Sequence, residues 1–233
     1  MNNLQIAQAL AFEPRKAFAE IAEKPRYWFP LLAVLIASLV MTVWYLSIVD
    51  LGWAADQQLH NSAFARNLTE EQIAQQAQLA QDRRGLQIGI YSFAIAIGVP
   101  IFYLLVALYN FLVGKMVRFE RSFRQWFAFT SWAALPGALA VIPAAILLAT
   151  TETTQIHQEQ LRSLSLNALI FHRSVGEPGY SLLSGVDLFQ LATLYLWLVG
   201  VKVWSGRSWL FAGLFVGIPW GLVYGCWALF SFR

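Results

Sequence analysis

Charged residues and cysteine are scarce in this chain of 233 residues. Only 12% of the residues are charged, against roughly 25% in an average soluble domain, whereas 58% are hydrophobic and the mean hydropathy is +0.53. Such a composition leaves too little polar surface to cover a protein in water. The single cysteine, Cys226, excludes an internal disulfide, and no cysteine–histidine spacing typical of zinc sites occurs.

Motifs of the common enzyme classes are also missing. The sequence contains no GxSxG, HExxH, P-loop or dinucleotide-binding glycine motif. His60, His157 and His172 all fall in predicted connections between apolar runs. A metal shared by His157 and Glu159 is one interpretation, and two solvated loop residues are the other. Because no nucleophile and base stand together at membrane depth, we expect no catalytic activity and no cofactor. The net charge of +3 gives no support for nucleic-acid binding.

Long apolar runs dominate what is present. Five runs come close to the ~20 residues needed to cross the hydrocarbon of a bilayer. They cover about residues 28–49, 86–114, 127–149, 180–204 and 209–230. Backbone groups in lipid must be satisfied within their own segment, so each run is predicted to be helical. Kinks are expected at the prolines inside the runs: Pro100, Pro136, Pro143 and Pro219. We therefore predict an all-α, polytopic membrane protein with a bundle of five transmembrane helices in a single membrane domain, residues 1–233.

Residues 1–27 form an amphipathic segment before the first run. Pro14 is well placed to begin the second of two short helices. The apolar side chains of the segment are expected in the lipid headgroup boundary: Leu10, Phe12, Phe18 and Ile21. Arg15 and Lys16 are among the residues expected to face water and lipid phosphate. A partly ordered cytoplasmic tail is the alternative interpretation.

Lysine and arginine placement predicts the orientation. The short connections are rich in them, whereas the long connections 50–85 and 150–179 hold few. The residues that mark the cytoplasmic side are Arg15, Lys16, Lys24, Arg26, Lys115, Arg118, Arg121, Arg124, Lys202 and Arg207. We expect a cytoplasmic N-terminus, an external C-terminus and two external connections. Each external connection should hold a short helix, one opening at a capping box from Thr69 to Gln72 and one following an apolar stripe over residues 154–171.

Two features of the last runs are candidates for function. Asp187, with Gln190 three residues later, is a polar pair in the fourth run. An acid at membrane depth often marks an ion or substrate path, whereas an acid at a helix start is an N-cap. The last run carries glycines at every fourth position, hereafter the glycine row: Gly213, Gly217, Gly221 and Gly225. Residues four apart share a helix face, so this row predicts close packing against the fourth run, or against a second copy or another protein.

Three groups of residues resemble the Yip domain (Ypt-interacting protein) family, most closely its bacterial branch. They are Phe12-Glu13-Pro14 with Phe18 and Ile21; Phe123-Arg124-Gln125-Trp126 leading to Pro136; and Asp187-Leu188-Phe189 leading to Trp197, Gly200 and a short basic turn. The resemblance implies a five-pass, non-enzymatic protein that works through partners. It also implies a bacterial cytoplasmic (inner) membrane location.

These observations predict a scaffold or assembly factor for another membrane complex, and the resemblance implies an ABC-type export system as one such complex. The expected partners are the lipid bilayer and another membrane protein or a second copy of the chain. The alternative is a small permease or channel subunit that uses Asp187.

Overall fold

The structure is a computed structural model that describes residues 1–60 and 68–232. Within these residues the β-type pairing is limited to an isolated antiparallel bridge between Ser165 and Asp187, and helices form the rest of the regular structure. In chain order the elements are α1 (Asn3–Phe12), α2 (Pro14–Glu23), α3 (Trp28–Ile48), α4 (Leu51–His60), α5 (Glu70–Asp82), α6 (Arg84–Met116), α7 (Phe123–Ala133), α8 (Pro136–Leu139), α9 (Val141–Thr150), η2 (Gln158–Leu161), η3 (Asn167–Phe171), α10 (Tyr180–Gly185), α11 (Leu188–Ser205) and α12 (Trp209–Ser231).

Five helical stretches among the described residues are long and apolar enough to cross a membrane. They are Trp28–Ile48, Arg84–Met116, Phe123–Thr150, Leu188–Ser205 and Trp209–Ser231. Many large apolar side chains along them remain exposed, including Phe93 of α6 and Leu222 of α12. Lipid is the environment in which such exposure costs nothing. The predicted all-α, multi-pass membrane protein is therefore confirmed.

Prolines interrupt the third of these stretches. α7 ends at Ala133, α8 begins at Pro136, and α9 begins at Val141, two residues before Pro143. Proline has no N–H to donate to the carbonyl four residues earlier, so each of these prolines removes one helical hydrogen bond. By contrast, Pro100 and Pro219 lie within α6 and α12, which continue through them.

The fourth stretch begins later than its predicted start at residue 180. Residues 180–185 form the separate helix α10, and α11 starts only at Leu188. Between the two helices the backbone is extended: the Leu166 N–H donates to the Val186 carbonyl at 2.8 Å, next to the Ser165–Asp187 bridge. These tertiary contacts use backbone groups that a continuous helix would need for itself.

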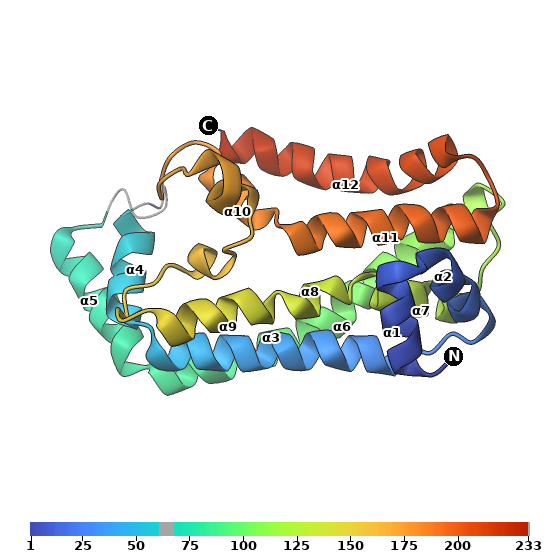
Figure 1. The fold of residues 1–233 in the computed structure, drawn as a ribbon. Coiled ribbons are helices and arrows are strands. Elements are labelled where there is room, and N and C mark those ends of the chain that lie inside the picture. The colour runs from blue at the N-terminus through green and yellow to red at the C-terminus, as the bar shows by residue number, and fades with distance from the viewer. Residues whose placement is uncertain (61–67, 233) are drawn as a thin grey trace. The chain divides into compact units, whose positions relative to one another are not determined.

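The chain divides into two compact units. The first unit consists of Met1–Ala37, Ala96–Leu139 and Leu188–Trp227, and the second of Ser38–Ile95, Ala140–Asp187 and Ala228–Arg233. In the first unit, the end that carries α1 and α2 also carries the connections from α6 to α7 and from α11 to α12 (Figure 1).

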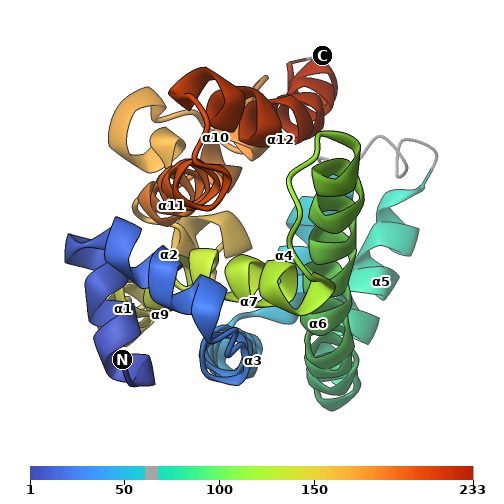
Figure 2. The same cartoon turned by 90° about the vertical axis from the view of Figure 1, so that its right-hand side faces the viewer.

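Large aromatic side chains form the core of the first unit. Trp126 and Phe129 of α7 are fully buried, and Trp197 and Trp204 of α11 nearly so. The ring centroid of Phe129 lies 5.0 Å from that of Trp197 and 4.9 Å from that of Trp204, each in an edge-to-face arrangement. Ring quadrupoles favour that geometry over face-to-face stacking. α2 packs beside α11 and α7 at this core (Figure 2).

The second unit contains an antiparallel pair of helices, α4 and α5. The Gln81 side chain near the end of α5 accepts from the Leu51 N–H at the start of α4 at 3.0 Å, while His60 at the end of α4 lies 3.3 Å from Glu70 at the start of α5. The predicted capping box is confirmed, because the Thr69 side chain accepts from the Gln72 N–H and the Gln72 side chain from the Thr69 N–H. The predicted connection 50–85 thus holds two helices, and residues 61–67 lie outside the described part.

The predicted helix over residues 154–171 is wrong. The structure has two short elements there instead, the 3₁₀ turn η2 and the single π turn η3. Around η2 the backbone carbonyls bond elsewhere: Thr154 accepts from the Asp50 N–H at 2.8 Å and Ile156 from the Tyr45 hydroxyl at 2.8 Å. These bonds hold the non-helical residues 151–157 against the start of α4 and against α3.

Candidate functional site

The N-terminal helices are bonded into the aromatic core of the first unit. The Trp204 indole N–H donates to the Phe18 carbonyl at 2.7 Å, and the Trp132 indole N–H to the Arg26 carbonyl at 2.6 Å. The Gln125 side chain adds a bond to the Ala22 carbonyl at 2.7 Å. All three accepting carbonyls lie at or beyond the middle of α2, so side chains of α7 and α11 hold this helix in place.

This docking corrects the expected position of the α2 side chains. Phe18 and Ile21 were expected in the headgroup boundary, but both are completely buried in protein, and Leu10 of α1 is buried as well. Phe12 differs, with 80% of its side chain exposed. An apolar helix face avoids water equally well under lipid or under protein, and here the aromatic core covers it.

Gly200 of α11 makes this close approach possible. A Cβ placed on it would lie 2.4 Å from a ring carbon of Phe129 and 2.9 Å from one of Phe18. Both distances are far below an ordinary van der Waals contact. The absence of a side chain at this position therefore lets α2 and α7 rest directly on the backbone of α11.

Two arginines form hydrogen bonds between the α6–α7 connection and the end of α11 with its following connection. The Arg121 guanidinium donates to the Trp204 carbonyl at 2.9 Å, which satisfies a carbonyl in the last turn of α11. Arg207 donates to the carbonyls of Val117 and Arg118 at 2.7 and 3.0 Å. Arg121, predicted as an interfacial cation, thus has a structural bond in addition to any contact with lipid.

The other predicted interfacial cations lie on the surface of the first unit. Arg15, Lys16, Lys115, Arg118 and Arg124 are all exposed. The Lys16 ammonium forms an ion pair with Glu13 at 3.0 Å, and that of Lys115 lies 4.4 Å from the centroid of the Phe111 ring. These positions leave them accessible to a membrane surface or a partner.

The glycine row of α12 faces open space. A Cβ placed on Gly213, Gly217, Gly221 or Gly225 would meet no described atom within 4 Å. These glycines therefore have no close neighbour among the described residues, α11 included. Around the row, Leu210 and Leu214 are largely exposed.

Asp187 lies at the boundary of a helix rather than in its middle. Asp187 directly precedes Leu188, the first residue of α11, and Gln190 lies in the first turn of that helix. The Asp187 carboxylate is only 10% exposed and lies 3.8 Å from the Arg162 guanidinium. A carboxylate at this position faces the positive end of the helix dipole, which supports the interpretation as an N-cap.

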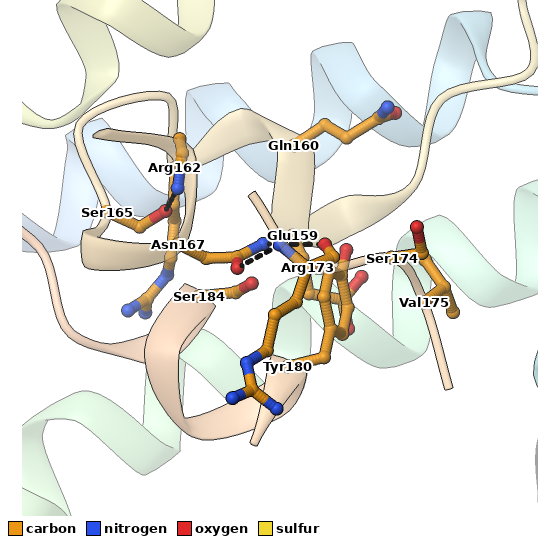
Figure 3. Close-up of a pocket in the computed structure, with 11 residues that line it drawn as sticks. Glu159, Gln160, Arg162, Ser165, Asn167, Arg173, Ser174, Val175, Tyr180 and Ser184 are labelled. Carbon is orange, nitrogen blue, oxygen red and sulfur yellow. Dashed lines mark hydrogen bonds between the residues drawn. The ribbon is translucent and has the colours of Figure 1, made fainter. Parts of the chain in front are cut away.

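A polar cavity of about 270 Å³ lies next to this ion pair in the second unit. Figure 3 shows its lining, in which Arg162, Arg173 and Glu159 are the charged side chains. Asn167 fixes the wall by two reciprocal bonds with the backbone of Arg173: its Nδ2 donates to the carbonyl at 3.0 Å and its Oδ1 accepts from the N–H at 2.9 Å. Burial, followed by the nearby Glu159 carboxylate, raises the pKa of Tyr180 in this wall.

Both arginines of the cavity are committed to the fold. Arg162 donates to the Gly185 carbonyl beside Asp187, and Arg173 donates to the Pro178 carbonyl. Ser165 accepts a hydrogen bond from the Ala168 N–H at 3.2 Å. The cavity residues thus stabilise the loops around α10, and the described residues contain no group of three or more metal-ligating side chains.

The Yip1 domain family model matches residues 8–230, nearly the whole chain. The chain belongs to the Yip1 domain family. No curated protein and no solved structure matches it. Membership extends over both compact units and all five candidate spans.

Each of the three groups that carry the resemblance to the Yip1 family contributes residues to the core of the first unit. Phe18 comes from its first group, Trp126 from its second, and Trp197 and Gly200 from its third. The Trp126 ring lies 5.4 Å from that of Phe129, which also contacts Phe18 and Trp197. Three segments far apart in the sequence thus build one aromatic core that holds α2.

Sequence reasoning missed two parts of the site. It did not assign Trp132 and Trp204 as hydrogen-bond donors, and it did not find the polar cavity. Trp132 lies inside the apolar run 127–149 and Trp204 ends the run 180–204, and their bonding partners lie 106 and 186 residues away. The cavity residues are spread between residues 159 and 184 without a regular spacing, so no pattern marks them.

Proposed function

We propose that this Yip1-family protein is a non-catalytic membrane scaffold that binds a transmembrane helix of another membrane protein along α12. The observation that carries the proposal is the glycine row, at which no described atom lies within 4 Å of any position where a Cβ would stand. Glycine at four successive turns leaves a shallow channel in the helix surface. A neighbouring backbone can approach such a channel closely, which is how membrane helices associate.

Side chains beside the channel suit a helix as its occupant. Leu214 and Ile218 border it and are more than half exposed. Along the other edge of the channel, the rings of Trp220 and Tyr224 stack with their centroids 5.7 Å apart. The rings of Tyr224 and Trp227 stack with their centroids 6.2 Å apart. The partner helix would gain dispersion contacts with these walls and with the glycine backbone. A component of an ABC-type export system is the class of partner that the family resemblance suggests.

Photo-crosslinking in native membranes tests the proposal. A photoreactive amino acid at Leu214 should give an adduct with a partner protein, whereas the same group at Leu104, an exposed residue of α6, should not. Adducts made only of two copies of this chain would replace the partner by self-association. Absence of protein adducts at Leu214 would mean that lipid covers the row, and the proposal would fail.

Substitution of the glycines gives a second test. Gly217→Leu or Gly221→Leu fills the channel and should abolish co-purification of the partner while the purified protein melts as wild type. The matched control is Val223→Leu, since Val223 is 59% exposed and points away from the row. Val216 cannot serve as the control, because it is buried in the core of the first unit.

A further inference from the structure

A groove of about 600 Å³ lies in the first unit, between the start of α2 and the residues of α11 and α12 that face it. We call it the basic groove. The end of α1 and the start of α2 form one wall, and Tyr195, Val199 and Trp209 form the other. Its full lining is Phe12, Glu13, Pro14, Arg15, Lys16, Tyr195, Val199 and Trp209.

Positive charge prevails in this groove. Arg15 and Lys16 line it, and the Arg15 guanidinium carbon and the Lys202 ammonium each lie 6.0 Å from the centroid of the Trp209 ring. Glu13 is the only acid in the lining, and its carboxylate is shared with Lys16 at 3.0 Å. Glu13 is also the N-cap residue of α2 and therefore offsets part of the positive end of the helix dipole, while the first turn of the helix itself adds no further acid. The groove therefore favours an anion.

Apolar surface continues from the groove along α11. Val199, Tyr195 and Leu191 are four residues apart and share one face of that helix. Val199 is buried, but Tyr195 is 56% and Leu191 42% exposed, so an open apolar track runs from Tyr195 to Leu191 on a helix of membrane-spanning length. Trp209, at the start of the next span, is a residue type that prefers the boundary between headgroups and hydrocarbon. An occupant must accordingly be anionic at one end and apolar at the other.

We propose that the basic groove binds an anionic glycerophospholipid of the surrounding bilayer. Its phosphate contacts Arg15 and Lys16 at the start of α2, and an acyl chain lies along Tyr195 and Leu191 of α11. A lipid fits better than an acidic peptide, because the apolar track leads along a span into hydrocarbon, where a peptide backbone would lose its hydrogen bonds to water. Since α2 is bonded to the aromatic core, the lipid would bind to a preformed wall.

Native mass spectrometry of the detergent-solubilised protein tests this assignment. The probes are dioleoyl phosphatidylglycerol and dioleoyl phosphatidylcholine, which share their acyl chains and differ in headgroup charge. We expect the wild type to bind phosphatidylglycerol at least about fivefold more tightly, the effect of one basic residue near an anionic headgroup. Equal affinity for the two lipids would overturn the proposal.

Charge variants identify the groove as the binding site. Arg15→Gln and Lys16→Gln should each weaken phosphatidylglycerol binding about fivefold, whereas Glu13→Gln, which removes the competing carboxylate, should strengthen it. Arg124→Gln is the matched control, because Arg124 is an exposed cation of the same unit outside the groove. If Arg15→Gln behaved as Arg124→Gln does, the groove would not be the site.

Two further measurements separate the lipid from simpler explanations. Tyr195→Ala should weaken binding of both lipids, since it removes part of the acyl track. Inorganic phosphate in excess should not displace phosphatidylglycerol, and displacement would show a small-anion site instead of a lipid site. Melting without added lipid should be the same for the charge variants and the wild type, because the replaced side chains are exposed; a lower melting temperature for Arg15→Gln would count against a direct lipid contact.

Discussion

Substitution of Gly200 by alanine tests whether the aromatic core depends on the absence of a side chain in α11. The new methyl group would lie 2.4 and 2.7 Å from two ring carbons of Phe129 and 2.9 Å from one of Phe18. Neither ring can turn away freely. Both side chains are completely buried, their centroids are 5.0 Å apart, and Phe129 is also enclosed by Trp197 and Trp204.

Two effects of opposite sign determine the size of the change. Forcing a methyl group into a packed core typically costs about 1–3 kcal/mol. Replacing glycine by alanine inside a helix gains about 1 kcal/mol of helix propensity. The same propensity gain applies at Gly213 of α12, where an added Cβ meets no described atom within 4 Å. The difference in the free energy of unfolding between Gly200→Ala and Gly213→Ala therefore isolates the packing cost, about 1–3 kcal/mol.

Equilibrium unfolding in mixed detergent micelles measures this difference. Both variants would be titrated from dodecyl maltoside into sodium dodecyl sulfate and followed by far-ultraviolet circular dichroism. Gly200→Ala should unfold at a lower fraction of dodecyl sulfate, because each 1.4 kcal/mol changes the unfolding equilibrium about tenfold. If Gly200→Ala proved as stable as Gly213→Ala, the close contact of α2 and α7 with α11 would be refuted.

Three more predictions concern separate parts of the chain. Trp204→Phe should destabilise the first unit by about 0.5–1.5 kcal/mol, because the Phe18 carbonyl loses the indole donor and keeps only its bond within α2; an unchanged unfolding transition would contradict the bond. The hydrogen bond to the Asp56 carbonyl, followed by the Asp56 and Glu70 carboxylates, raises the pKa of His60 above 6.5. Protonated His60 therefore stabilises the α4–α5 pair fully below about pH 6.5, and hydrogen-exchange protection of these helices should fall as the pH rises through the higher folded pKa; in His60→Gln that dependence should vanish. With five spans, a green fluorescent protein that matures only in the cytoplasm should be bright before Met1 and dark after Arg233; brightness at both ends would mean an even number of spans.

Local signals in the sequence identified several helix starts correctly. Thr69 and Gln72 form the capping box that the spacing predicts, and Pro14 begins α2. Such signals depend on residues within one turn of each other. Apolar runs of about 20 residues likewise identify helices of membrane length, because the bilayer sets that length.

Tertiary hydrogen bonds were the part that the sequence could not supply. The apolar stripe over residues 154–171 has a helical period, yet the carbonyls of Thr154 and Ile156 bond to Asp50 and Tyr45, more than 100 residues earlier. Periodicity reports which side chains avoid water and says nothing of where a carbonyl finds its donor. For the same reason the sequence predicted that Phe18 avoids water but not that protein side chains, rather than lipid, cover it.

The glycine row shows the converse limit. Its spacing correctly places four glycines on one face of α12, and the structure adds that no described atom covers that face. A repeat of small residues predicts that something packs closely, but the identity of the neighbour depends on surfaces outside the pattern.

Asp187 offers a direct choice between the scaffold and the permease interpretations. Its carboxylate lies 3.8 Å from Arg162, whose side chain is half exposed, so the pair contributes at most about 1 kcal/mol. Asparagine caps a helix about as well as aspartate, whereas loss of a capping side chain costs about 0.5–2 kcal/mol. If Asp187 is the N-cap of α11, Asp187→Asn should unfold nearly as the wild type does, and Asp187→Ala should unfold more readily.

Equal loss of stability in both variants would instead assign the role of Asp187 to its charge, and the N-cap interpretation would be wrong. The permease interpretation predicts a different result for the same variants. Loss of the carboxylate should then abolish flux in reconstituted vesicles even though Asp187→Asn remains folded. Asp187 directly precedes α11, its backbone pairs with Ser165, and its carboxylate lies beside Arg162. This position suits a residue that ends a loop and begins a helix. We therefore expect the Asn variant to retain both its fold and its partner, and vesicles containing the wild-type protein to show no flux that depends on Asp187.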